Sequence, residues 1–144
     1  MAKSVQLREK EALRKFLINR RSELGPSIDF QSNILNNIKP LIEEIENEYI
    51  GTYISFRDEL DTKKLNQNLL ERELNLALPA IDFKTKEINF FMYHKNTELI
   101  ENKFSILEPK NKDKVIFPKI ILIPLLGYSK SGFRLGYGGG YYDK

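Results

Sequence analysis

The chain has 144 residues, of which 41% are hydrophobic and 30% are charged, and its formal net charge is +3. This length and composition are typical of one globular domain, so we predict that residues 1–144 form a single domain. The absence of cysteine excludes disulfides, thiolate catalysis and cysteine-ligated zinc. No apolar run reaches the roughly 18–20 residues of a membrane span, and the N-terminus is charged from Lys3 onward, so we predict a cytoplasmic protein without a signal peptide.

Two helices are expected in the first 45 residues. Residues 3–24 carry apolar side chains at helical spacing, and the Gly-Pro-Ser sequence at residues 25–27 is expected to end that helix. A second apolar stripe runs through residues 28–45, where Pro40 is expected to break or kink the helix. The apolar side of the first helix is expected to comprise Leu13, Phe16, Leu17 and Leu24.

Three segments in the middle of the chain predict strands. Residues 49–56 are rich in aromatic and β-branched residues, residues 74–81 have the composition of a buried strand, and residues 87–93 are expected to form a hairpin with a neighbouring strand. A short helix is expected after the first of these strands, capped by Asp61 or Thr62.

Residues 115–124 form the most continuous apolar run, which is typical of a central strand buried on both faces. Pro118 interrupts the run, so the strand itself is expected to start near Lys119. We predict an α/β fold in which helices pack on a mixed, mostly parallel sheet in a Rossmann-like, three-layer arrangement. In such folds ligands bind beyond the carboxyl ends of the strands, and we expect the functional site there.

The last stretch, Gly127 to Lys144, contains six of the eight glycines, four of the seven tyrosines, Arg134 and Asp143. Glycine loses much backbone freedom on folding and suits positions where φ is positive or where a ligand approaches the backbone. Consecutive N–H groups without Cβ atoms form a concave nest that binds anions. A strand followed by this loop therefore predicts a phosphate cradle. The interleaved arginine, tyrosines and aspartate argue against the alternative, a flexible glycine-rich tail.

Residues 132–143, GFRLGYGGGYYD, resemble the signature G-x-RLG-x-G-x-GYYD of the 5-formyltetrahydrofolate cyclo-ligases, also called methenyltetrahydrofolate synthetases. In that family the signature follows a strand that ends in proline, as it follows Pro124 here. Near the other end, residues 10–14, KEALR, resemble the family's K-x-x-L-R segment. The resemblance covers nearly the whole chain, although only its two ends and Glu59 are specific. Family members continue beyond GYYD, so the given sequence is expected to be either a fragment of a longer protein or a relative with a shortened C-terminal part.

The resemblance implies the ATP-dependent cyclisation of 5-formyltetrahydrofolate to 5,10-methenyltetrahydrofolate, with release of ADP and phosphate, in one-carbon metabolism. It implies ATP as co-substrate and Mg²⁺ as metal ion. The substrate would supply both nucleophiles, which agrees with the absence of cysteine and the single histidine, His94. The alternative for a shortened chain is a non-catalytic nucleotide- or folate-binding relative.

Carried over position by position, the resemblance also implies site residues. Two cations would act in catalysis: Lys10 and Arg134. The residues implied to bind ATP are Lys10, Arg14, Arg134, Leu135, Gly136, Tyr137, Gly138, Gly139, Gly140, Tyr141 and Tyr142. The residues implied to bind the folate are Ile54, Glu59, Tyr137, Gly138, Gly139, Gly140 and Tyr141. Asp143 would hold the magnesium ion.

Simpler interpretations exist for several of these residues. Without the C-terminal motif, Lys10 and Arg14 would be interpreted as solvated charges of a surface helix, and Glu59 as a carboxylate at a helix entry. The basic ends of the chain would also suit an RNA-binding domain, but they neither form a dense cluster nor interleave with stacking aromatic residues. We expect small-molecule substrates, no nucleic-acid or membrane partner, and a monomer.

Overall fold

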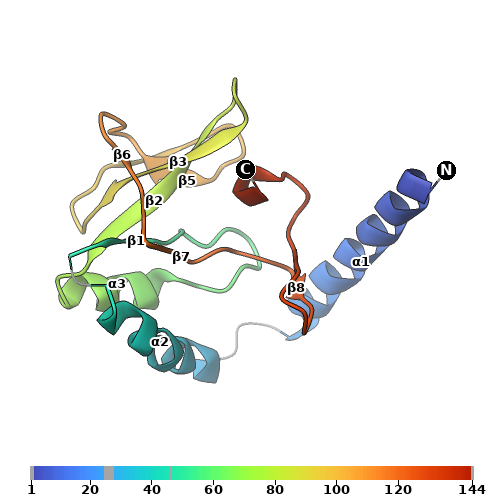
Figure 1. Ribbon diagram of the computed structural model, residues 1–144, viewed down its shortest axis with the longest axis horizontal. Helices are drawn as coiled ribbons and strands as arrows, with labels where there is room; N and C mark the ends of the chain where they lie inside the picture. The colour runs from blue at the N-terminus through green and yellow to red at the C-terminus, as the bar shows by residue number, and fades with distance from the viewer. Residues whose placement is uncertain (1, 25–27, 46, 144) are drawn as a thin grey trace.

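The computed structural model describes residues 2–24, 28–45 and 47–143 (Figure 1). Its helices are α1 (Ala2–Leu24), α2 (Ile28–Glu43), α3 (Lys63–Glu71) and the short 3-10 helix η1 (Tyr141–Asp143). Its strands are β1 (Tyr49–Gly51), β2 (Asn75–Asp82), β3 (Glu87–Tyr93), β4 (Leu99–Glu101), β5 (Leu107–Pro109), β6 (Val115–Ile116), β7 (Ile120–Ile121), β8 (Gly127–Tyr128) and β9 (Arg134–Leu135).

A five-stranded mixed sheet, in the order β6-β3-β2-β1-β7, forms the centre of the molecule. Strand β1 pairs in parallel with both β2 and β7, whereas β3 pairs antiparallel with both β2 and β6. The predicted α/β class with a mixed sheet is therefore confirmed, but the sheet is not mostly parallel, because parallel pairing is confined to the half of the sheet around β1. Two small antiparallel hairpins, β4–β5 and β8–β9, lie outside this sheet.

The two faces of the sheet are covered differently. Helices α2 and α3 pack on one face, where Ile50, Leu69 and Leu76 are at most 1% exposed (Figure 1). On the other face Phe90 packs with Ala77 and Ile116, and Tyr142 of η1 packs against this cluster. Burying these side chains is the main source of folding free energy. Within the described ranges, this second face therefore meets the end of the chain instead of a further long helix.

The predicted helices and the β2–β3 hairpin are present. Helix α1 spans nearly the expected residues, but Leu13 and Phe16, expected on its packed side, are 48% and 58% exposed. Helix α2 continues through Pro40, so the predicted break is absent. Pro40 and the residue four positions before it are exposed, which lets water satisfy the carbonyl group that loses its hydrogen bond. No helix in the described ranges is long and apolar enough to cross a membrane.

The central position predicted for the strand in residues 115–124 is wrong, although a strand, β7, does begin next to Lys119 as predicted. The run is split into β6 and β7, which lie at opposite edges of the sheet, and Phe117 between them is 86% exposed. The connecting residues pass over Gly51, where a Cβ atom would lie 2.9 Å from Phe90 Cε1 and 3.1 Å from Pro118 Cγ. The apolar run thus belongs to a segment that crosses the sheet from one edge to the other. The spacing of apolar residues in the sequence cannot distinguish such a crossing from a buried strand.

The first strand is also shorter than predicted, because β1 ends at Gly51 instead of reaching Phe56. Beyond it, the Thr52 N–H still donates to the Ala77 carbonyl at 2.9 Å, and the chain then leaves the sheet as the loop of residues 53–62. Polar side chains supply the contacts that a strand ladder would otherwise make. This loop extends beyond the carboxyl end of β1, where the sequence predicts the functional site.

Candidate active site

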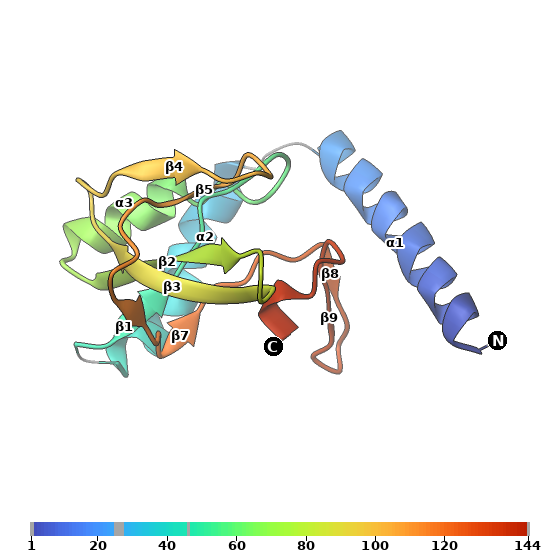
Figure 2. The ribbon, with the colours of Figure 1, turned by 90° about the horizontal axis from the view of Figure 1, so that it is seen from above.

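Helix α1 contacts the C-terminal segment through a narrow stripe of residues on one of its faces. Arg14, Leu17 and Arg21 are three and four residues apart, so they lie on the same face of the helix, and all three are half-buried. Figure 2 shows that α1 extends away from the sheet and approaches the rest of the molecule near β8. Leu17 packs onto Gly127, where a Cβ atom would lie 3.0 Å from Leu17 Cδ1. Glycine at this position leaves room for the end of the Leu17 side chain.

Arg14 reaches the backbone of the glycine-rich loop. Its Nε–H donates to the Gly136 carbonyl at 3.0 Å. Its guanidinium group lies 3.4–3.7 Å from the place where a Cβ atom of Gly138 would stand. Gly138 has a φ of 102°, a conformation that side-chain-bearing residues rarely adopt. The structure thus joins a predicted phosphate-binding arginine to the predicted phosphate loop across more than a hundred residues of sequence.

Arg134 folds back on the end of the same loop. Its Nη2 donates to the Tyr142 carbonyl at 2.7 Å and to Asp143 Oδ1 at 2.5 Å. The Asp143 side chain is 69% exposed, so the pair remains accessible to solvent and ligands. The residue predicted to bind phosphate and the residue predicted to bind metal therefore neutralise each other in this structure.

Glu59 lies beside three tyrosines and Arg21. Its Oε2 accepts a hydrogen bond from the backbone N–H of the residue three positions earlier, at 2.9 Å. Burial raises the pKa of Glu59 above its usual range, and this hydrogen bond and the Arg21 charge oppose that rise. Burial raises the pKa of Tyr53, Tyr137 and Tyr142, and the Glu59 carboxylate raises each further. These electrostatic effects place Glu59 in the same site as two tyrosines of the C-terminal segment.

A buried hydrogen-bond network holds the loop that carries Ile54 and Glu59. The Thr62 hydroxyl donates to the Tyr53 carbonyl at 2.6 Å, and Asn66 Nδ2 donates to the same carbonyl at 3.0 Å. The Thr52 hydroxyl donates to Asn66 Oδ1 at 2.6 Å. Since all four groups are buried, losing one partner would leave the others unsatisfied. Thr62 therefore uses its side chain to hold the loop and makes no side-chain cap bond to α3. Asp61, the other predicted capping residue, supplies that contact, because its Oδ1 accepts a hydrogen bond from the Lys63 N–H at 2.8 Å.

Comparison with known proteins assigns the family. Residues 6–144 match the model of the 5-formyltetrahydrofolate cyclo-ligase family. The chain belongs to this family. It is 34% identical over 119 residues to the 5-formyltetrahydrofolate cyclo-ligase of Haemophilus influenzae, an alignment that covers 79% of this chain and 64% of that protein. The corresponding protein of Escherichia coli K12 is 33% identical over 100 residues, which cover 66% of this chain and 55% of that protein.

Solved structures agree with this membership. The NMR structure of Aquifex aeolicus 5,10-methenyltetrahydrofolate synthetase is similar with a TM-score of 0.73 and 27% identity, over 93% of this chain and 70% of that one. The Mycoplasma pneumoniae 5,10-methenyltetrahydrofolate synthetase has a TM-score of 0.56 and 26% identity, over 93% and 74%. The predicted family is confirmed. This chain spans less than two thirds of the length of the two curated relatives above.

The structure brings most residues that the cyclo-ligase signature implies into two connected groups. Arg14 meets the loop at its start, Arg134 closes its end, and Glu59 lies beside the tyrosines. Lys10 is exposed and forms no hydrogen bond or ion pair with the part of the chain that the structure describes. The other implied residues lie in the loop or next to it: Ile54, Leu135 and Tyr141 are half-buried, and Gly139 and Gly140 are exposed.

The sequence analysis missed two residues of this site, Arg21 and Tyr53. Arg21 Nη1 donates to the Tyr137 hydroxyl at 2.7 Å, and Nη2 donates to the Leu125 carbonyl at 2.5 Å. The signal for Arg21 was present, because it lies seven residues after Arg14 and hence on the same helix face. Tyr53 is 8% exposed and lies in a segment predicted to be a strand, and that segment gave no sign that the charge of Glu59 would raise the pKa of Tyr53.

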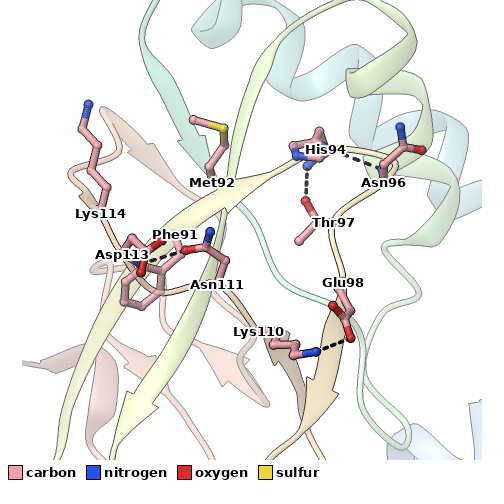
Figure 3. Close-up of a pocket in the computed structure, with 10 residues that line it drawn as sticks. All are labelled: Phe91, Met92, His94, Asn96, Thr97, Glu98, Lys110, Asn111, Asp113 and Lys114. Carbon is pink, nitrogen blue, oxygen red and sulfur yellow. Dashed lines mark hydrogen bonds and ion pairs between the residues drawn. The ribbon is translucent and has the colours of Figure 1, made fainter.

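A separate pocket, or hollow, of about 570 Å³ lies beside the C-terminal end of β3 (Figure 3). It contains none of the residues implied by the cyclo-ligase signature. Several of its polar groups are paired with one another: Thr97 with the His94 backbone, and Lys110 with Glu98 at 2.6 Å. Figure 2 shows the chain end near the β2–β3 turn, at the opposite end of β3. This hollow is therefore distinct from the candidate active site.

Proposed function

We propose that this chain catalyses the ATP-dependent cyclisation of 5-formyltetrahydrofolate to 5,10-methenyltetrahydrofolate, with release of ADP and phosphate. The observation that carries this proposal is the contact between Arg14 and the backbone at Gly136–Gly138. It combines a permanent positive charge with a glycine-rich backbone, the two features that recognise a polyphosphate. The family membership and the accompanying Glu59–tyrosine cluster support a folate beside the nucleotide.

The proposed chemistry needs no nucleophile from the protein. The formyl oxygen of the substrate attacks the γ-phosphorus of ATP, a new oxygen–phosphorus bond forms, and ADP leaves. The neighbouring N10 then attacks the activated carbon and closes the five-membered ring, and phosphate leaves with the former formyl oxygen. The protein contributes positioning and neutralisation of charge on the transferring phosphoryl group.

Each feature of the signature has a proposed role in that scheme. Arg14 and Arg134 donate to phosphate oxygens, and Lys10, one helical turn before Arg14, joins them when nucleotide is bound. The backbone of residues 136–140 approaches the terminal phosphate. Ile54 and Glu59 contact the folate. The pKa of Glu59 is raised because its carboxyl group is partly buried, and the flat ring system of the folate would bind beside this partly buried group. Tyr137 and Tyr141 border both substrates.

The proposed magnesium site rests on Asp143. The residues that the structure describes contain no group of three or more histidine, cysteine, aspartate or glutamate side chains suited to a metal ion. One exposed carboxylate nevertheless fits Mg²⁺ that arrives with ATP, since this ion is commonly held by one or two carboxylates together with phosphate oxygens and water. Mg²⁺ would neutralise charge on the phosphates. Asp143 would then exchange its bond with Arg134 for the metal, which frees Arg134 for phosphate.

An absorbance assay for the methenyl product tests the proposal. The protein is incubated with 5-formyltetrahydrofolate, ATP and Mg²⁺, and ADP is measured in parallel. We expect one ADP for each methenyl product, no ADP without folate, and loss of product in Arg134→Ala. Lys63→Ala is the matched control, because Lys63 is an exposed cation of α3 outside the candidate site.

Two results would overturn the proposal. Product formation that is equal in Arg134→Ala and wild type would remove the role of the loop. Nucleotide or folate binding without product would support the non-catalytic relative. We further propose that the protein acts as a monomer in the cytoplasm on small molecules alone, which size-exclusion chromatography with light scattering and a salt-dependent RNA-binding assay would test.

A further inference from the structure

We propose that Arg21 is a positioning residue of the candidate active site, which clamps the base of the β8–β9 hairpin against α1 and orients Tyr137. The inference rests on the function proposed above and adds a residue that the family signature does not contain. Arg21 touches neither phosphate nor folate in this proposal. It acts through Tyr137 and through the hairpin that carries Arg134.

The contacts of Arg21 explain why it would act as a clamp. One nitrogen donates to the Leu125 carbonyl just before β8, and the other donates to the Tyr137 hydroxyl two residues after β9. A single guanidinium group therefore joins both ends of the hairpin to α1. The Leu126 N–H donates to the Leu135 carbonyl at 2.8 Å across the same base. Because Arg134 begins β9, the position of the hairpin sets the position of the proposed phosphate ligand.

The charge of Arg21 also faces the half-buried acidic group of the site. It lowers the pKa of Glu59, of Tyr53 and of Tyr137, in each case against the larger effect of burial. Among the described residues Arg21 and Glu59 form no ion pair, so the Arg21 charge acts on Glu59 over a longer distance. Arg21 thus makes directional contacts with the hairpin and also keeps positive potential beside Glu59.

A second contact fixes the same end of α1. The Ser22 hydroxyl donates to Asp58 Oδ2 at 3.0 Å, which joins the helix to the loop that carries Glu59. Adjacent residues 21 and 22 therefore hold the two halves of the site, the tyrosine-bearing loop and the glutamate-bearing loop. The planar guanidinium group of arginine supplies two donors in a fixed geometry, whereas a lysine ammonium group at this position could satisfy only one of the two acceptors well.

The test compares Arg21→Gln and Arg21→Lys with Arg20→Gln. Arg20 is an adjacent, exposed arginine on α1 with no hydrogen bond or ion pair among the described residues, so its variant is the matched control. We expect kcat/KM for methenyl formation to fall about ten- to a hundred-fold in Arg21→Gln, as for loss of a hydrogen bond to a charged group. The decrease is expected mainly in kcat, since Arg134 would be misaligned at the transferring phosphoryl group. Arg21→Lys should lie between, and Arg20→Gln should match wild type.

A double variant separates positioning from a general structural role. If Arg21 acts through Tyr137, then Arg21→Gln added to Tyr137→Phe should lower kcat by less than Arg21→Gln alone. Full additivity of the two changes would overturn the role assigned to Tyr137. Equal kcat in Arg21→Gln and Arg20→Gln would overturn the positioning role as a whole.

An NMR readout keeps the test independent of turnover. In protein labelled with ¹³C-tyrosine, the Cζ signal of Tyr137, assigned by its loss in Tyr137→Phe, should move in Arg21→Gln and stay in place in Arg20→Gln. An unmoved signal in Arg21→Gln would refute the contact. If the wild type makes no product, the proposed function falls while this measurement still decides on Arg21. If Arg21→Gln does not fold, Arg21→Lys is measured in the same way.

Discussion

The sheet with α2 and α3 and the C-terminal segment with α1 are held together by different forces. In the first region Ile50, Leu69 and Leu76 are almost completely buried, and their apolar contacts stabilise the fold. In the second region Arg14 and Arg134 hold a glycine-rich loop by hydrogen bonds, of which the Arg14 bond is partly buried and the Arg134 bonds are exposed to solvent. Solvent-exposed polar contacts contribute little to the free energy of unfolding.

This difference separates stability from chemistry along the chain. A substitution in the sheet region should change the free energy of unfolding, whereas a substitution in the C-terminal segment should change catalysis with little effect on folding. Loops that bind ligands are commonly among the less stable parts of a protein, since they must open and close around the ligand. The predictions below test this separation.

The largest effect on folding is expected for Leu69→Ala. Leu69 of α3 is fully buried against β1 and β2, so truncation should lower the free energy of unfolding by about 2–5 kcal/mol through lost contacts and a cavity. Urea denaturation followed by circular dichroism measures the change. Leu41→Ala is the control, because Leu41 is 51% exposed on α2. Equal destabilisation by the two variants would mean that α3 does not form the core described here.

The largest effect on chemistry is expected for Arg134→Ala. Removing a cation that stabilises a transferring phosphoryl group should lower kcat/KM about 10²–10³-fold. The ion pair with Asp143 is exposed, so the free energy of unfolding should change by less than about 1 kcal/mol. Steady-state kinetics and urea denaturation of the same preparation check both parts. A strongly destabilised variant would contradict the proposed separation of the two regions.

A smaller effect on folding is expected for Gly51→Ala in the sheet region. The added methyl group would lie 2.9 Å from Phe90 Cε1 and 3.1 Å from Pro118 Cγ, so neighbouring atoms must move. Overpacking of this kind should lower the free energy of unfolding by about 1–3 kcal/mol. Gly127→Ala provides the comparison, since its methyl group would meet only the flexible end of Leu17. A thermal melt that ranks Gly127→Ala below Gly51→Ala in stability would refute this account.

The smallest effect concerns the pH dependence of stability in Glu59→Gln. Burial raises the pKa of Glu59 in the folded protein, so the folded state binds this proton more tightly than the unfolded state. The free energy of unfolding then falls as the pH rises from the usual pKa of glutamate through the raised value. Glutamine does not titrate and keeps an acceptor for the Phe56 N–H, so the variant should lack this decrease and be slightly more stable at neutral pH.

Denaturation of Glu59→Gln and wild type at several pH values measures that difference. The same variant should form methenyl product more slowly, because Glu59 is proposed to contact the folate. Such a gain in stability with a loss of activity is typical of a functional carboxylate in a partly buried position. Parallel pH profiles of stability for the two proteins would show that Glu59 is not desolvated in the folded state.

Local sequence patterns predicted most elements because their signals span only a few residues. The β3 bounds are the predicted ones, α1 is within one residue of them, and residues 74–81 differ from β2 by a single position. The loop of residues 132–143 was recognised by its glycines and its neighbours. Two failures concern residues 115–124 and the length of β1, where apolar composition was typical of a strand but the position in the sheet depended on distant partners. The short hairpins β4–β5 and β8–β9 were not predicted.

The sequence allowed most residues of the site to be predicted, but it did not show which of them contact one another. The signature named Arg134 and Asp143 but gave no sign that they bond to each other, because that pairing depends on how η1 turns back. Spacing placed Arg14 and Arg21 on one helix face but did not show that this face meets the hairpin. Tyr53 was hidden in a segment that resembles a strand.

By itself, the sequence determined the α/β class, the family and the glycine-rich loop, since each depends on neighbouring residues or on a short motif. Only the tertiary structure decided which face of α1 meets that loop, which strands lie at the edges of the sheet, and how Glu59 comes to lie beside Tyr142. Those contacts join residues up to 122 positions apart. They are selected by the packing of the whole chain, which short-range periodicity does not encode.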